Sequence, residues 1–173
     1  DHRNSLDYAE LLISHHPDNW NGFGRAAQDL VALKQFQEAQ TKIQAGLERF
    51  PNQLNLLVIA TDVYRASGDH RNSLDYAELL ISHHPDKLTG YIRAVQDLTK
   101  LKRLDEAVVV VNRGLGEMPY DIDMIVLGSN AYRQAGKPKG SINLCQIALQ
   151  KGLGSPWYWH ERISNDYTQL GAS

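Results

Sequence analysis

The sequence predicts an all-α fold, a solenoid built from antiparallel helix pairs, and three observations point to it. One pattern of large and small residues returns every 34 residues along most of the 173-residue chain. Within each repeat the apolar residues recur at steps of three and four, which is the spacing of one face of an α-helix. Glycines and prolines divide each repeat into two segments of helical length. We therefore expect about ten helices and no strands.

The repeats can be numbered through the chain from the large apolar residue that begins each one. Each has a small residue near the middle of its first helix and another early in its second, and the first three close with a proline. In the fourth repeat Leu153 replaces the proline and the next segment runs one residue late, which indicates a one-residue insertion. We expect one repeat domain over 1–173: a lone second helix at 1–19, complete repeats at 20–53, 54–87, 88–121 and 122–155, and a lone first helix at 156–173.

This order of residues resembles the tetratricopeptide repeat. In the first repeat the matching residues are Phe23, Ala26, Leu30, Ala39 and Pro51, and the same positions recur in the following repeats. The resemblance covers almost the whole chain. It implies a right-handed superhelical array with a concave face lined by the first helices. It also implies a non-catalytic scaffold that binds other proteins.

One segment of the chain occurs twice without a single difference. Residues 1–18 are identical to residues 69–86, whereas residues 19–39 match 87–107 at only ten of 21 positions. Selection on packing does not explain the identity, because the exposed positions of a helix are free to vary. We interpret it as a recent copying event, either gene conversion in a longer natural array or an engineered end.

Composition excludes several classes of function. The formal charge of −2 and the pI near 6.4 lack the basic excess of a nucleic-acid-binding protein. No apolar run approaches the ~20 residues of a membrane span. The single cysteine, Cys145, excludes an internal disulfide and lies in an apolar stretch that predicts a buried thiol. The sequence does not indicate a cellular compartment, and we expect a cytoplasmic protein.

We expect the ligand groove on the faces of the first helices. Apolar side chains there would supply binding energy, and arginine, asparagine and glutamine side chains would orient an extended peptide or a helix. The candidate groove residues are Arg25, Gln28, Asn55, Ile59, Asp62, Arg65, Ile92, Arg93, Gln96, Val126, Leu127, Asn130, Arg133 and Arg162.

The arginines of this set support two interpretations. Arg25, Arg93 and Arg162 occupy matching positions, and a row of guanidinium groups would suit an acidic partner. Each of the three also has an aspartate four residues later, which on a helix is a neighbour that forms an ion pair. Such pairs would cancel most of the positive field, so both interpretations stay open.

We expect no enzyme, no metal and no cofactor. No phosphate-binding glycine loop, nucleophile elbow or metal motif occurs in the sequence. The histidine pairs His15-His16 and His83-His84 lie before prolines, without cysteines or convergent carboxylates, and we interpret them as exposed residues. The aromatic run 157–160 is interpreted as core, with a stacking platform for a sugar or base as the alternative.

The two ends of the chain suggest alternative functions. A lone second helix and a lone first helix could complete each other between molecules, giving a homo-oligomer that stacks head to tail. The residues expected at these self-association ends are Leu6, Ala9, Leu12, Ile13, Trp159, Ile163 and Tyr167. A further alternative is a regulatory or substrate-presenting arm of a larger enzyme, such as one that handles glycans.

Overall fold

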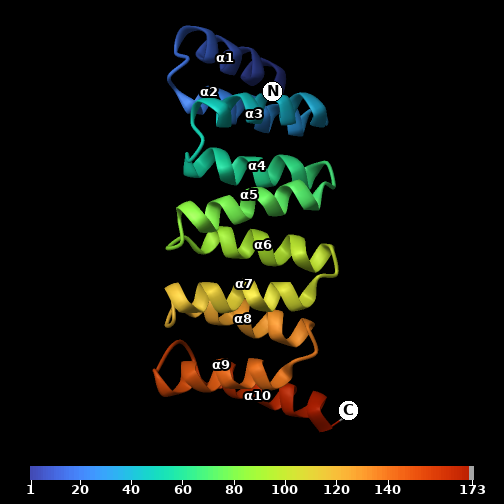
Figure 1. Cartoon of the computed structure of the whole chain (residues 1–173), viewed down its shortest axis with the longest axis vertical. Coiled ribbons are helices and arrows are strands. Elements are labelled where there is room, and N and C mark those ends of the chain that lie inside the picture. Colours follow the sequence, from blue (N-terminus) through green and yellow to red (C-terminus); the bar gives the residue numbers. More distant parts are fainter. Residues whose placement is uncertain (172–173) are drawn as a thin grey trace. The chain divides into compact units, whose positions relative to one another are not determined.

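The computed structural model describes residues 1–171, and these form ten helices and no strand (Figure 1). The predicted all-α fold class is therefore confirmed. The helices are α1 (His2–His15), α2 (Trp20–Ala32), α3 (Phe36–Arg49), α4 (Leu54–Ala66), α5 (His70–His83), α6 (Leu88–Lys100), α7 (Leu104–Glu117), α8 (Ile122–Gln134), α9 (Pro138–Gln150) and α10 (Pro156–Gly171). None of these helices combines the length and the apolar character needed to cross a membrane.

The chain divides into two compact units, Asp1–Arg93 and Ala94–Ser173, and the division falls within α6. Each unit is a series of helices joined by short loops, so that consecutive helices run antiparallel. In unit 1 the helices α1 to α5 follow one another in space as they do in sequence (Figure 1). The first helices α2 and α4 also contact each other directly.

The core of unit 1 lies between the helix pairs. Phe23 and Leu30 of α2, Ile43 of α3 and Leu56 of α4 are almost completely buried in one apolar cluster. Close approach of the helices depends on a glycine. A Cβ atom at Gly46 of α3 would lie 2.8 Å from the Cβ atom of Phe23, a distance that such atoms do not tolerate.

Unit 2 has a core of the same kind. Ile125 of α8, Cys145 and Ala148 of α9 and Trp159 of α10 are buried together. The predicted buried position of the single thiol is confirmed, since Cys145 has no exposed surface. The indole Nε1 of Trp159 donates a hydrogen bond to the carbonyl oxygen of Leu153 at 2.5 Å. This bond fixes the entry of α10 at the position where the sequence carries its extra residue.

The turns inside the repeats use a left-handed residue. Gly68 and Gly136 have φ of +81° and +69°, which suits glycine because it has no side chain to clash. The matching positions of the other repeats are Lys34 and Lys102, with φ of 62° and 61°. The N-caps of α2 and α4 are Asn19 and Gln53, whose side chains accept hydrogen bonds from backbone N–H groups of the first turn.

Candidate functional site

Unit 1 contains an open groove with a volume of about 750 Å³. Three helices form its walls. Tyr8 and Leu12 of α1 give it an apolar side, and Arg25 of α2 gives it a charge. The full lining is Ser5, Tyr8, Ala9, Leu12, Trp20, Asn21, Arg25, Gln28, Asn55, Val58 and Ile59.

The duplicated sequence allows the exposure of the α1 side chains in this groove to be compared with that of identical residues in α5. Helices α1 and α5 have the same fourteen residues and the same length. Leu80 and Ser73 of α5 are buried, whereas the matching Leu12 and Ser5 of α1 are only half-buried. Tyr8 is 72% exposed. Because the sequences are identical, the difference comes from the neighbours of each helix.

The neighbour that covers α5 is α4. The ring of Tyr64 stacks on that of Tyr76, with 5.3 Å between their centroids. The hydroxyl of Ser73 donates a hydrogen bond to the carbonyl oxygen of Thr61 at 3.2 Å. Burial, with a contribution from the neighbouring Tyr64, raises the pKa of the Tyr76 phenol to about 12. The matching Tyr8 and Ser5 of α1 line the groove instead.

A third contact of α4 is with α6, the first helix of the next repeat. Arg93 of α6 forms an ion pair with Asp62 of α4, with 2.8 Å between Nη1 and Oδ1. Arg25 of α2 matches Arg93 in the repeat and, like Tyr8, lines the groove. Tyr76, Ser73 and Arg93 thus contact α4. Their counterparts Tyr8, Ser5 and Arg25 line the groove instead.

A buried carboxylate holds the charged wall of the groove. Asp29 of α2 is 2% exposed, and its carboxylate lies 3.2 Å from Nε of Arg25 and 2.8 Å from Nδ1 of His2. Burial raises the pKa of Asp29, but the hydrogen bonds from Ser5 and His2 and the charge of Arg25 outweigh it, so the pKa lies below its usual value. Asp29 therefore stays ionised and fixes the guanidinium of Arg25 in place.

The structure brings four of the predicted groove residues together in unit 1. Arg25, Gln28, Asn55 and Ile59 all line the pocket. The remaining predicted residues of this unit lie outside its lining, with Asp62 and Arg93 in their own ion pair, and Arg65 and Ile92 half-buried.

The predicted groove residues of unit 2 form a polar network. Arg162 of α10 donates hydrogen bonds to Asn130 Oδ1 at 2.6 Å and to Ser129 Oγ at 2.7 Å. Arg133 Nε lies 2.7 Å from Oδ1 of the buried Asp166, an ion pair without the alignment of a hydrogen bond. The other predicted residues of this unit are the exposed Gln96 and the half-buried Val126 and Leu127.

Two residues predicted at the self-association ends are not exposed. Ala9 and Trp159 are each 1% exposed, because Ala9 faces α2 and Trp159 fills the core of unit 2. Leu6 and Ile13 pack partly against the core of unit 1, and Ile163 against that of unit 2. Leu12 lines the groove, and Tyr167 is 56% exposed. The apolar stripe assigned to the first helix thus mostly faces its own unit.

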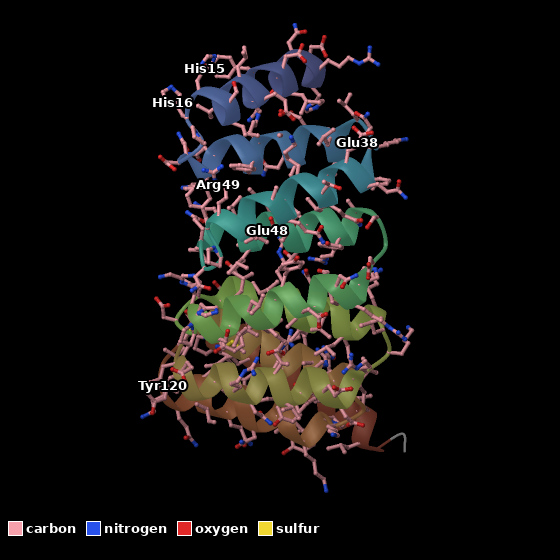
Figure 2. All side chains as sticks on the ribbon, turned by 45° about the horizontal axis from the view of Figure 1, so that its top comes forward. His15, His16, Glu38, Glu48, Arg49 and Tyr120 are labelled. Carbon is pink, nitrogen blue, oxygen red and sulfur yellow. The ribbon has the colours of Figure 1, made fainter. Side chains whose placement is uncertain are left out.

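Of the two histidine pairs predicted to be exposed, His15, His16 and His83 are exposed at helix ends, whereas His84 is half-buried, with its Nε2 3.0 Å from the carbonyl oxygen of Asn52. His15 and His16 lie at the end of α1, beside the turn that leads into α2 (Figure 2). In residues 1–171, no three histidine, cysteine or acidic side chains gather in a way that could hold a metal ion. Of the aromatic run 157–160, Trp159 is core whereas Trp157 is 71% exposed.

Sequence reasoning missed Tyr8 and Trp20 as groove residues. Neither was among the candidate groove residues, because the helix-packing pattern marks residues that can be buried without showing which of them are covered. The exact copy at 69–86 carried a usable signal, because Tyr76 marks the position that a preceding helix covers.

No protein-family model matches the chain, and no curated protein matches it either. Solved structures do. The MamA protein superposes with a TM-score of 0.67 at 12% identity, over 87% of this chain and 82% of that protein. TTC0263, a thermophilic TPR protein of Thermus thermophilus, gives a TM-score of 0.58 at 13% identity, over 96% of this chain and 91% of that protein.

A third structure is that of YrrB, a TPR protein with an unusual peptide-binding site. It gives a TM-score of 0.62 at 13% identity, over 86% of this chain and 77% of that protein. At such low identities the agreement concerns the path of the backbone alone. Together with the 34-residue pattern and the ten helices of residues 1–171, it shows that the chain has the fold of the tetratricopeptide repeat proteins.

Proposed function

We propose that the chain is a non-catalytic protein-interaction scaffold and that the groove of unit 1 binds an amphipathic helix. The observation that carries the proposal is the pair of identical segments, one covered by α4 and the other open to the groove. The contacts of α4 define what the groove would accept: an aromatic ring on Tyr8, a backbone carbonyl near Ser5 and an acidic side chain beside Arg25.

The chemistry of the lining supports a helical protein segment over a small molecule. The groove is open, and its lining combines apolar side chains from all three helices with polar side chains such as Arg25 and Gln28 of α2. Helix-in-groove recognition uses anchors at three- and four-residue spacing, such as Thr61 and Tyr64 of α4. A fold likeness to a peptide-binding TPR protein is compatible with this function but gives no ligand.

The test uses a probe with known contacts. A fluorescent peptide of residues 53–69 contains the helix that covers α5, and α1 has the sequence of α5. We expect the peptide to bind the whole chain and raise its fluorescence anisotropy. Arg25→Glu should weaken binding by about tenfold, because it places a like charge beside Asp62 of the probe. Lys139→Glu, an exposed change on α9 of unit 2, serves as the control.

Charge exchange makes this test specific. A peptide with Asp62→Lys should bind the Arg25→Glu variant more tightly than it binds the unaltered chain. Thermal unfolding of each variant establishes that the groove is folded. Equal binding of the peptide to the Arg25→Glu and Lys139→Glu variants would contradict the assignment of the groove.

A further inference from the structure

We propose that the helix received by this groove is α10 of a second copy of the chain. The inference rests on the proposed function, since it names the partner of the same groove. It differs from a general affinity of the two ends, because it specifies the residues that meet. Tyr167 of one copy stacks on Tyr8 of the next as Tyr64 stacks on Tyr76 within unit 1.

The register follows from the repeat. Arg162 and Asp166 of α10 match Arg25 and Asp29 of α2, which places α10 three periods and one inserted residue beyond α4. In this register Tyr167 takes the position of Tyr64, and Gly171 that of the turn residue Gly68. The end of α10 therefore repeats the tyrosine near the end of α4 and the glycine of the turn that follows α4.

The exposure of α10 agrees with this role. Tyr64 is only 4% exposed beneath α5, whereas Tyr167 is 56% exposed. Ser164, which matches Thr61, is also exposed and would bring its backbone carbonyl to Ser5 of the other copy. Trp159 points the other way, into the core of unit 2, as Leu56 does in unit 1. The docking face and the core face of α10 are thus distinct.

Two positions depart from the α4 pattern and set the strength of the contact. Asn165 stands where α4 has Asp62, so Arg25 would gain a hydrogen bond in place of an ion pair. His160 stands where the completely buried Leu57 lies in α4. Both changes weaken the contact relative to its internal counterpart, and we expect a small, transient interface rather than a permanent one.

The experiment is sedimentation velocity of the whole chain from micromolar to millimolar concentrations. The sedimentation coefficient should rise with concentration. Tyr8→Ser and Tyr167→Ser should each weaken self-association by about tenfold or more, since each removes half of the stacked pair. Tyr120→Ser is the matched control, because Tyr120 is 53% exposed and lies outside the proposed contact.

Mixing distinguishes this arrangement from a symmetric dimer. The Tyr8→Ser copy keeps Tyr167, and the Tyr167→Ser copy keeps Tyr8, so an equal mixture should regain association and stop at the dimer. His160→Leu and Asn165→Asp should each strengthen association, and Tyr8→Ser should remove the gain.

The results separate the two proposals. A chain that stays monomeric at millimolar concentration while it binds the peptide of residues 53–69 would overturn the identity of the partner and leave the groove function intact. Absence of both self-association and peptide binding would overturn both. Association that is unchanged in Tyr8→Ser, or that mixing does not restore, would also refute the contact proposed here.

Discussion

At the scale of single residues, buried carboxylates hold the first helices to the second helix before them. Asp29 and Asp166 match in the repeat, and each accepts hydrogen bonds from the preceding helix, Asp29 from Ser5 and Asp166 from Ser141. The ion pair of Arg25 with Asp29 was one of the two interpretations that the sequence left open, because residues four apart on a helix are neighbours. It did not predict that Asp166 pairs with Arg133, since that partner comes from a different helix.

The charge of Asp29 makes unit 1 sensitive to acid. Because its pKa in the folded chain lies below the unfolded value of 3.8, its ionised form stabilises the fold above that value. This stabilisation is lost as the pH falls through the folded pKa. We expect Asp29→Asn to lower the free energy of unfolding by about 1–2 kcal/mol at neutral pH.

Urea unfolding of both proteins from about pH 6 to about pH 2 measures this effect. The difference between the unaltered chain and Asp29→Asn should shrink as the pH falls. A difference that stays constant through this range would show that the carboxylate is not preferentially ionised in the folded state.

At the scale of the helix, glycines decide how closely a pair can pack. In α3 a Cβ atom at Gly46 would lie 3.2 Å from Cγ of Phe23 as well as 2.8 Å from its Cβ, and neither can move without shifting α2. In α7 a Cβ atom at Gly116 would have no neighbour within 4 Å. The sequence predicted small residues between helices, but Gly46 was not among those singled out.

These two glycines give opposite predictions for the same substitution. Gly46→Ala should destabilise the chain by about 1–2 kcal/mol, because overpacking exceeds the gain in helix propensity. Gly116→Ala should stabilise it by about 0.5 kcal/mol, since only the propensity changes. Chemical denaturation of both variants measures the effects, and a stabilising Gly46→Ala would show that α2 and α3 are not in close contact there.

The duplicated helix supplies a second pair of matched substitutions. Tyr76→Ala should cost about 2 kcal/mol of unfolding free energy, because it removes a stacked, half-buried ring. Tyr8→Ala, in the same local sequence, should change stability by less than about 0.5 kcal/mol. The measurements use dilute samples so that self-association does not contribute. An equal loss of unfolding free energy in the two variants would contradict the different burial of the two helices.

At the scale of the whole molecule, the 34-residue repeat and the spacing of apolar residues determined which features could be predicted from the sequence. The all-α class, the number of helices in residues 1–171 and the fold followed from spacing, because each helix must bury one face against its neighbours. The open face of α1 did not follow from spacing. Identical residues at 1–18 and 69–86 have different exposures, so only the neighbours visible in three dimensions reveal the groove.

The most direct test of the central claim compares the amide hydrogen exchange of these two identical segments. NMR is required, because the segments give identical peptic fragments. In dilute protein the amides of α1 should exchange faster than the matching amides of α5, and saturating peptide 53–69 should slow those of α1 while leaving α5 unchanged. Exchange in α1 that does not respond to the peptide would contradict the claim that its open face receives a helix.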